Sequence, residues 1–389
     1  MSKRIGIEVS LAVSEAVKLA NTDVVAAYPI TPQTHIVEHL SELVADGSLD
    51  AAYIPVESEH SAMSSCIGSS AAGARTFTAT SSQGLALMNE MLFIAPVLRT
   101  PIVLAIANRA LSAPINIWND HSDIMSVRDA GWICLFAENG QEATDLTLLA
   151  FRIGEDPAVS LPVSVNIDGF TLSHFIEPIL LPEQAEVDKF LPPYKPSLQL
   201  DIKKPISIGL LGGPECYTES RKAADNILES SKVVVKKAFD EFAAVFGRQY
   251  HVVESYRTED ADTIVVLMGS IAETAMTAVD EYRQQSEHKV GLVRLRLWRP
   301  FPAAELLESL GKAKNVAVID RHMVLGSPSG PLGLEIKSLL YSSPLRPKVT
   351  NFQLGLGGRD VTRDDFKYIF DRAASDEAQA RCELVGVYE

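Results

Sequence analysis

The stretch Tyr28-Pro29-Ile30-Thr31-Pro32-Gln33-Thr34 decides how the first part of this chain is interpreted. Residues 24–28 form an apolar run with the length of a buried strand, and the two prolines then force the backbone out of regular structure. Residues 34–45 have the pattern of a helix. Thr31 is therefore expected just beyond the end of a strand and just ahead of a helix.

Two more polar side chains follow apolar runs in the same way. Glu59 comes after the strand-like residues 51–56, and Arg109 comes after residues 101–107. Ligands of an open parallel sheet bind in the crevice at the carboxyl ends of its strands. A hydroxyl, a carboxylate and a guanidinium are therefore expected to share one crevice. Each residue also has a structural alternative, namely a proline turn for Thr31, a helix-dipole partner for Glu59 and a surface ion pair for Arg109.

Residues 1 to about 180 alternate strand-like and helix-like runs, which predicts an α/β fold with a parallel sheet covered on both faces. The other strands expected here are residues 76–79, 102–107, 132–136 and 162–167, and the other helices are residues 61–74, 85–97 and 141–155. The helix over residues 61–74 is almost entirely Gly, Ala and Ser, so its backbone is expected to approach a neighbouring helix or a second subunit closely.

The pattern changes after this part. Five prolines are spread over residues 179–205, which predicts an extended surface connector, and an amphipathic helix is expected over residues 219–246. A second α/β unit begins near residue 262, with strands expected at residues 263–268, 290–297 and 316–319 and a capping box at residues 362–365. We therefore predict one domain over residues 1–250, including the connector and the linking helix, and another over residues 251–389.

Composition excludes several classes of protein. The 389 residues carry a formal net charge of −15, which argues against a nucleic-acid binder. No apolar run reaches the roughly 20 residues of a membrane helix, and the first ten residues do not resemble a signal peptide, so a cytoplasmic protein is expected. The four cysteines lie far apart without a C-x-x-C pair, which predicts neither an iron–sulfur cluster nor a zinc site in this chain.

Three further signals are weaker. His121 with Asp120 or Asp123 could ligate a metal, but a turn network is the better interpretation, and no metal is expected in this chain. The run Ser81-Ser82-Gln83-Gly84 could cap a helix or cradle an anion. A dehydrogenase would need a glycine fingerprint after its first strand, where this chain has Tyr28-Pro29-Ile30. A non-catalytic scaffold would not predict charged residues at several strand ends.

Five motifs occur in order along the chain: Tyr28-Pro29-Ile30-Thr31-Pro32-Gln33-Thr34, Glu57-Ser58-Glu59-His60-Ser61-Ala62-Met63-Ser64, Ala72-Gly73-Ala74-Arg75, Thr80-Ser81-Ser82-Gln83-Gly84-Leu85-Ala86-Leu87-Met88 and Ala107-Asn108-Arg109-Ala110. Together they resemble the alpha subunit of multi-subunit pyruvate:ferredoxin oxidoreductase, also called pyruvate synthase. The resemblance extends over nearly the whole chain and includes Asp168-Gly169-Phe170, Phe190-Leu191-Pro192-Pro193-Tyr194-Lys195-Pro196 and Arg299-Pro300-Phe301-Pro302.

This resemblance implies an enzyme that uses thiamine diphosphate, bound between two related α/β domains. The family's diphosphate-binding domain carries a Gly-Asp-Gly motif, which is absent here. The chain thus resembles the pyrimidine-binding domain, followed by a domain similar to the C-terminal domain of transketolase. By the same resemblance, a beta subunit would hold the diphosphate, Mg²⁺ and a [4Fe-4S] cluster. Gamma and delta subunits would complete the complex and carry further clusters, and ferredoxin would accept the electrons.

The resemblance also implies a task for each site residue. Glu59 matches the glutamate that hydrogen-bonds N1′ of the cofactor pyrimidine and promotes deprotonation of the thiazolium carbon. Arg109 matches the arginine that binds the substrate carboxylate, and Thr31 matches the threonine that contacts a substrate oxygen. The implied reaction converts pyruvate and coenzyme A to acetyl-CoA and CO₂, reversibly, and passes two electrons to ferredoxin.

Substrate choice within the superfamily is an open alternative. The run Ser81-Ser82-Gln83-Gly84 resembles the pyruvate branch, whereas the branches acting on 2-oxoisovalerate and 2-oxoglutarate more often carry Ser-Gly-Pro-Gly there. Relatives that act on oxalate carry an arginine in place of Thr31. Pyruvate is therefore the expected substrate, with another 2-oxoacid or a non-catalytic structural subunit as the alternatives.

Overall fold

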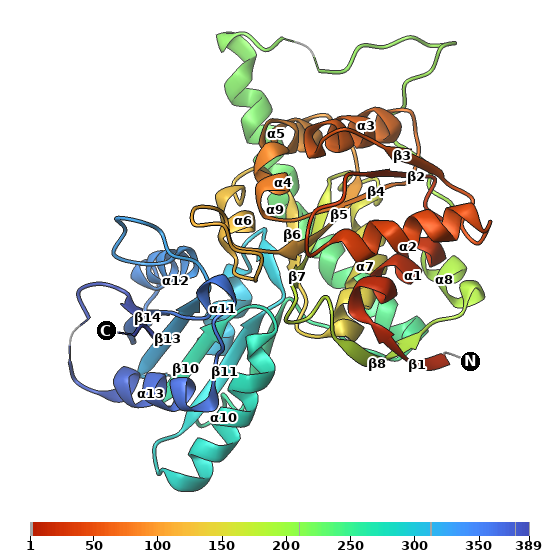
Figure 1. Cartoon of the computed structure of the whole chain (residues 1–389). Helices are drawn as coiled ribbons and strands as arrows, with labels where there is room; N and C mark the ends of the chain where they lie inside the picture. The colour runs from red at the N-terminus through yellow and green to blue at the C-terminus, as the bar shows by residue number, and fades with distance from the viewer. Residues whose placement is uncertain (1–2, 210, 312, 378, 389) are drawn as a thin grey trace.

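Two mostly parallel sheets organise the chain, which is described here by a computed structural model over residues 3–209, 211–311, 313–377 and 379–388 (Figure 1). The first sheet has the strand order β12-β6-β7-β5-β4-β2-β3. Its strands are β2 (Val24–Ala27), β3 (Ala52–Pro55), β4 (Thr76–Thr80), β5 (Ile102–Asn108), β6 (Ile133–Phe136), β7 (Val163–Asp168) and β12 (Leu297–Arg299). All neighbours pair in parallel except β12, which is antiparallel to β6.

Helices cover both faces of this sheet, with α3 and α5 on one face and α1, α2 and α7 on the other (Figure 1). The helices are α1 (Val9–Leu19), α2 (Thr34–Ala45), α3 (Glu59–Ala71), α4 (Ser82–Leu87), α5 (Asn89–Val97), α6 (Ser122–Ser126) and α7 (Gly140–Gly154). The central strands β4, β5 and β7 are buried along their whole length, as expected for parallel strands covered on both faces. The predicted parallel sheet is thus confirmed.

The second sheet has the order β15-β14-β13-β10-β11-β9. Its strands are β9 (Val253–Tyr256), β10 (Thr263–Leu267), β11 (Val290–Leu295), β13 (Asn315–Asp320), β14 (Lys348–Gln353) and β15 (Glu383–Leu384). The helices of this part are α10 (Ile271–Gln285), α11 (Ala303–Leu310), α12 (Pro331–Tyr341) and α13 (Arg363–Ala374). The predicted capping box of α13 is confirmed, because Thr362 and Asp365 bond each other's backbone N–H.

The prediction that residues 179–205 are wholly extended is wrong. Residues 176–181 form β8, which pairs antiparallel with β1 (Lys3–Glu8), and α8 (Gln184–Phe190) follows. A capping box between Glu183 and Glu186, directly after Pro182, starts α8. The prolines therefore lie near the ends of regular elements and do not make the whole stretch irregular. The extended part begins after α8 and leads to the long helix α9 (Pro214–Phe246), whose first turns project from the body at the top of Figure 1.

Other boundaries also differ from prediction. The helix expected over residues 61–74 is α3, residues 59–71, and the helix expected over residues 219–246 is α9, which already begins at Pro214. The helix expected over residues 85–97 is two helices, α4 and α5, which meet at Met88. The strand expected over residues 290–297 ends at Leu295, and the chain then crosses to the first sheet as β12. Within the described ranges, none of the helices combines the length and the apolar character needed to cross a membrane.

Candidate functional site

The order of the first sheet places a crevice at the carboxyl end of β2. The chain runs from β2 outward to β3 and then returns across β2 to form β4, so the strand order reverses at β2. In open α/β sheets, ligands bind at such a reversal, outside the carboxyl ends of the strands. Thr31 follows β2, Glu59 follows β3 and Arg109 directly follows β5, so all three predicted residues lie at this edge.

Arg109 and Thr31 are in direct contact. The guanidinium Nη1 donates to the carbonyl oxygen of Thr31 at 2.9 Å, and Nε donates to the carbonyl oxygen of Asn116 at 2.8 Å. Arg109 is only 6% exposed, while Thr31 is exposed. Within the described residues, Nη2 has no hydrogen-bond partner, which leaves one edge of the guanidinium open to an anion.

The carboxylate of Asp123 joins the backbone segments that follow β4 and β5. It accepts hydrogen bonds from the backbone N–H groups of Arg109 at 2.9 Å and Ser82 at 3.1 Å, and from the side chain of Asn108 at 3.0 Å. Burial raises the pKa of Asp123 to about 6, and these hydrogen bonds oppose the rise. Burial lowers the pKa of Arg109, and the charge of Asp123 works against that shift.

Glu59 occupies a different environment at the start of α3. The Ser58 hydroxyl caps this helix by accepting from the N–H of Ser61, so the helix does not depend on Glu59 for its cap. Glu59 is 6% exposed, yet no hydrogen bond or ion pair to its carboxylate is found among the described residues. A Cβ atom at Gly84 would lie 2.6 Å from Oε1 of Glu59 and 2.5 Å from Oγ1 of Thr80, so the helix α4 approaches both side chains too closely for anything but glycine.

Two other buried polar atoms near the end of β4 also lack partners. Oγ1 of Thr80 and Oε1 of Gln33 have no hydrogen bond, although Nε2 of Gln33 donates to the carbonyl oxygens of Tyr28 and Ala79. Buried polar groups are nearly always paired, so unpaired ones at a strand-end crevice indicate a ligand. No sequence signal had singled out Thr80 or Gln33 as site residues, although both lie in the motifs quoted above.

The stretch from Asn116 to Asp123 is a hydrogen-bonded turn network, as its residue types predicted. His121 bonds Asp168, Asp120 bonds Ser122, and Asp123 bonds backbone N–H groups, so the three side chains do not converge on one point. The run Ser81-Ser82-Gln83-Gly84 also makes a structural hydrogen bond. The Ser82 hydroxyl donates to the carbonyl oxygen of Ala110, in the loop that follows Arg109, at 2.7 Å.

Asp168 is the centre of a second cluster, at the junction of the two sheets. Its carboxylate pairs with Nε2 of His121 at 2.9 Å and with Nη1 of Arg321 at 2.8 Å, and it accepts the backbone N–H of Ser270 at 2.9 Å. Burial alone would raise the pKa of Asp168, but Arg321 and His121 outweigh burial and hold that pKa well below its usual range. This carboxylate is therefore ionised and fully paired.

One group of metal-ligating side chains lies close together in the described part of the chain, namely Glu8, His35 and His174. Nδ1 of His35 pairs with Glu8 at 2.7 Å, and Nδ1 of His174 lies 2.8 Å from the Ser173 hydroxyl. The two rings are tilted by 36° to each other, with their centroids 4.5 Å apart. Both Nδ1 atoms therefore already have a protein partner.

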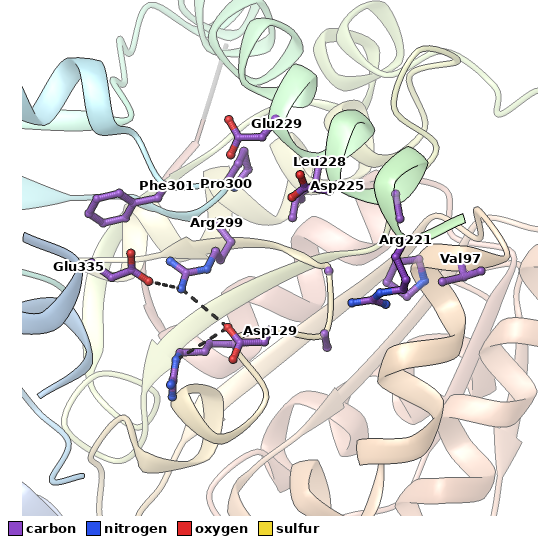
Figure 2. Close-up of a pocket in the computed structure, with 15 residues that line it drawn as sticks. Val97, Asp129, Arg221, Asp225, Leu228, Glu229, Arg299, Pro300, Phe301 and Glu335 are labelled. Carbon is purple, nitrogen blue, oxygen red and sulfur yellow. Dashed lines mark hydrogen bonds and ion pairs between the residues drawn. The ribbon is translucent and has the colours of Figure 1, made fainter. Parts of the chain in front are cut away.

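A cavity of about 270 Å³ lies elsewhere, between α9 and the β12 region, and Figure 2 shows its lining. Arg299 projects into it and pairs with Glu335 at 2.6 Å. Asp129, Asp225 and Glu229 add further negative charge, so the arginine is already compensated. None of the three predicted site residues lines this cavity, and it is separate from the strand-end crevice.

Comparison with known families agrees with this geometry. The family model described as "Pyruvate flavodoxin/ferredoxin oxidoreductase, thiamine diP-bdg" matches residues 15–240, and "Pyruvate:ferredoxin oxidoreductase core domain II" matches residues 261–366. The chain belongs to the pyruvate flavodoxin/ferredoxin oxidoreductase family. The resemblance read from the five motifs is thereby confirmed.

Several relatives of this oxidoreductase chain are similar over almost their whole length. Pyruvate synthase subunit PorA of Methanocaldococcus jannaschii is 50% identical over 369 residues, covering 94% of each chain. PorA of Thermotoga maritima is 46% identical over 372 residues, covering 95% of this chain and 94% of its own. Ketoisovalerate oxidoreductase subunit VorA of Pyrococcus abyssi is also 46% identical, over 360 residues, covering 92% of this chain and 90% of its own.

Solved structures confirm the predicted fold class. A 2-oxoglutarate:ferredoxin oxidoreductase from Magnetococcus marinus superposes with a TM-score of 0.68 at 20% identity, covering 95% of this chain and 65% of that longer chain. A split-gene transketolase superposes with a TM-score of 0.54 at 12% identity, covering 95% of this chain and 98% of that chain. The first unit is thus of the thiamine-diphosphate-binding type, and the second resembles the C-terminal domain of transketolase.

Proposed function

We propose that this oxidoreductase chain is the alpha subunit of an enzyme that oxidises pyruvate with coenzyme A to acetyl-CoA and CO₂ and passes two electrons to ferredoxin. The observation that carries the proposal is a buried carboxylate without a partner, Glu59, at the same sheet edge as a guanidinium with one open side, Arg109. The relatives named pyruvate synthase support the choice of pyruvate.

The residues around Glu59 fit the aminopyrimidine part of thiamine diphosphate. That ring offers an amino donor and ring-nitrogen acceptors, and the crevice offers the Glu59 carboxyl together with the unpaired oxygens of Thr80 and Gln33. Gly84 keeps the backbone of α4 close without filling the space beside Glu59. When bound, the cofactor would supply a carbanion that attacks the keto carbon and stabilises the charge left by departing CO₂.

Each side chain of this subunit has a task that follows from its surroundings. The Glu59 carboxyl would donate its proton to N1′ of the pyrimidine, a ring nitrogen that carries no hydrogen of its own, and so promote the imino tautomer; among the described residues no protein group bonds this carboxyl. Nη2 of Arg109 would bind the pyruvate carboxylate, while Nη1 stays on the Thr31 carbonyl and holds the guanidinium in place. The short Thr31 hydroxyl would contact a substrate oxygen and leave room for the methyl group of pyruvate.

Partner chains would supply the remaining chemistry. The absence of Gly-Asp-Gly from the sequence supports a beta subunit that would hold the diphosphate, Mg²⁺ and a [4Fe-4S] cluster, and gamma and delta subunits would bring further clusters. Cys66 and Cys134 are poor cluster ligands, because both are buried and burial raises their pKa values to about 12 and about 11. We further propose a cytoplasmic location and a domain division at residues 250/251.

The second candidate is the same reaction on 2-oxoisovalerate. The VorA relative supports it, since its identity equals that of one pyruvate synthase relative. The two substrates differ in the size of the group beside the keto carbon. The shape of a pocket alone changes the binding free energy by about 1–3 kcal/mol for each extra methylene. The run Ser81-Ser82-Gln83-Gly84 favours pyruvate, as argued above.

The test is a purification of this chain with the subunits that accompany it, followed by assays of ferredoxin reduction, with coenzyme A for the three 2-oxoacids and without it for oxalate, which leaves no acyl group to transfer. Pyruvate, 2-oxoisovalerate, 2-oxoglutarate and oxalate are compared by kcat/KM. We expect pyruvate to give the highest value and the chain alone to be colourless and inactive. A higher value for 2-oxoisovalerate would assign the second candidate, and full activity in a complex lacking this chain would make it a structural subunit.

A further inference from the structure

The loop that follows Arg109 reaches across to the second α/β unit. Nδ2 of Asn116 donates to the carbonyl oxygen of Gly357 at 2.9 Å, and the N–H of Gly358 donates to the carbonyl oxygen of Asn119 at 2.6 Å. These contacts join residues that are more than 200 positions apart in the sequence. The turn that receives them, residues 355–358, follows β14 of the second sheet.

Asn116 contacts both Arg109 and the second unit. Its carbonyl oxygen accepts Nε of Arg109 at 2.8 Å, and its side-chain Oδ1 accepts the N–H of Trp118 at 2.7 Å. Its remaining group, Nδ2, is the donor to Gly357. A displacement of the 355–358 turn would therefore move the oxygen that holds one edge of the Arg109 guanidinium.

The turn is shaped for this close contact. Gly357 and Gly358 have φ values of +57° and +79°, a region that favours glycine. A Cβ atom at Gly358 would lie 2.2 Å from Cβ of Trp118, and one at Gly357 would lie 2.5 Å from Nδ2 of Asn116. Both glycines thus allow the turn to lie directly against the loop that carries Asn116 and Trp118.

We propose that Asn116 is a positioning residue through which the 355–358 turn of the second unit orients Arg109 toward the substrate carboxylate. This inference rests on the carboxylate-binding role proposed above for Arg109. It gives the second unit a part in 2-oxoacid recognition, because the orientation of the guanidinium depends on contacts outside the first sheet. The turn contributes no atom to the substrate itself.

Docking of the two units does not depend on Asn116. The buried ion pair between Arg321 and Asp168 at 2.8 Å and the one between Arg296 and Glu142 at 2.6 Å already join them. Loss of the Asn116–Gly357 bond should therefore leave assembly intact and change only the placement of Arg109. This separates a positioning role from a purely structural one.

The test compares Asn116→Asp with wild type in the purified complex. Aspartate keeps the acceptor for the Trp118 N–H but lacks the donor to Gly357, so one hydrogen bond is lost. We expect KM for pyruvate to rise about three- to tenfold, the worth of one such bond, with kcat and KM for coenzyme A unchanged. Glu273→Gln is the matched control, since Glu273 bonds Asn139 across the same junction without touching the Arg109 loop, and it should change neither constant.

A second perturbation comes from the other side of the contact. Gly358→Ala pushes Trp118 away from the turn and should raise the same KM even if Asn116→Asp assembles poorly. In the double variant Arg109→Lys/Asn116→Asp, KM should be no higher than in Arg109→Lys alone, because both changes act on one contact.

Three results would overturn the inference. The first is an unchanged pyruvate KM in both Asn116→Asp and Gly358→Ala while Arg109→Lys raises it. The second is a rise in KM for coenzyme A equal to the rise for pyruvate, and the third is additive effects in the double variant. An unchanged KM in Arg109→Lys itself would instead refute the proposed role of Arg109, so the two failures are distinguishable.

Discussion

Glu59 and Asp168 are both buried acids at the carboxyl edge of the first sheet, but their surroundings differ. Asp168 pairs with Arg321 and His121 and accepts the backbone N–H of Ser270. Glu59 has no hydrogen bond or ion pair in the described part of the chain. The fold satisfies the hydrogen-bonding capacity of Asp168, whereas the carboxyl group of Glu59 remains available to a ligand.

This difference shows how a structural acid can be told from a functional one without a ligand present. A buried charge whose partners lie on both units holds those units together, and its removal leaves the partners uncompensated. Burying a carboxylate without a partner lowers the stability of the fold, so such a residue is typical of sites where a ligand supplies the missing partner. The same sheet edge therefore carries two kinds of acid. Asp168, at the end of β7, joins the two units and is called the fastening point below, whereas Glu59, beside β3 and β4, is available to a ligand.

The largest effect is expected at the fastening point. Asp168→Asn leaves the buried Arg321 charge without a counter-ion and should lower the free energy of unfolding by about 3–5 kcal/mol. Urea unfolding of the purified chain measures this loss, with Glu59→Gln as the control that should lose less than about 1 kcal/mol. Equal losses in the two variants would remove the contrast between the acids.

Glu59→Gln should have the opposite profile. The complex should assemble normally, but turnover should fall at least about a hundredfold, because glutamine cannot exchange a proton with N1′ of the pyrimidine. Steady-state turnover of the assembled variant is the measurement. Near-normal activity would contradict the catalytic role of Glu59.

Thr31→Arg tests how the crevice selects its substrate. A second guanidinium beside Arg109 would face the methyl group of pyruvate without a partner, at a cost of about 2 kcal/mol, so kcat/KM for pyruvate should fall about thirtyfold. Thr31→Ser keeps the hydroxyl and serves as the control. Retained pyruvate turnover in Thr31→Arg would place residue 31 outside the substrate pocket.

Arg109→Lys keeps the charge but loses the rigid planar fork that lets Nη2 face the substrate while Nε and Nη1 stay bonded to backbone carbonyls. KM for pyruvate should rise about tenfold, while the affinity of the complex for thiamine diphosphate stays unchanged. Kinetics at varied pyruvate and a separate cofactor titration distinguish the two constants. If only the cofactor titration changes, Arg109 serves the cofactor and not the substrate.

The smallest effect concerns pH. Burial raises the pKa of Asp123 to about 6, so its charged form is present above that pH and is lost as pH falls through it. Protonation turns one of its acceptor oxygens into a donor and weakens its hold on the Arg109 and Ser82 N–H groups, which should lower kcat/KM several-fold below about pH 6. Asp123→Asn should remove this limb of the profile. A limb that persists would point to Asp320, whose pKa burial also raises to about 6.

The sequence predicted most of the first sheet because its signals are local. The bounds of α2 were predicted correctly, and the strands were placed to within about two residues, since these buried strands are rich in apolar residues and several are bounded by Pro or Gly. Elements of the proline-rich stretch were missed, because β8 is an edge strand that tolerates Pro178 and α8 begins two residues after Pro182.

The site was predictable in part for the same reason. The positions of Thr31, Glu59 and Arg109 follow from where strands end, and the contact between Thr31 and Arg109 confirms that two of them meet. The partners of these residues were not predictable. The contact of Asn116 with Gly357 and that of Asp168 with Arg321 depend on how the two units dock, which no local pattern encodes.

The central claim is that Glu59 is left unpaired so that it can act on the cofactor. The most direct measurement is the hydrogen–deuterium exchange rate of the thiazolium C2 proton of thiamine diphosphate bound to the assembled complex, followed by NMR after acid quench. Wild type should exchange at least about a hundredfold faster than Glu59→Gln, while Arg109→Lys should match wild type. Equal exchange rates in wild type and Glu59→Gln would contradict the claim.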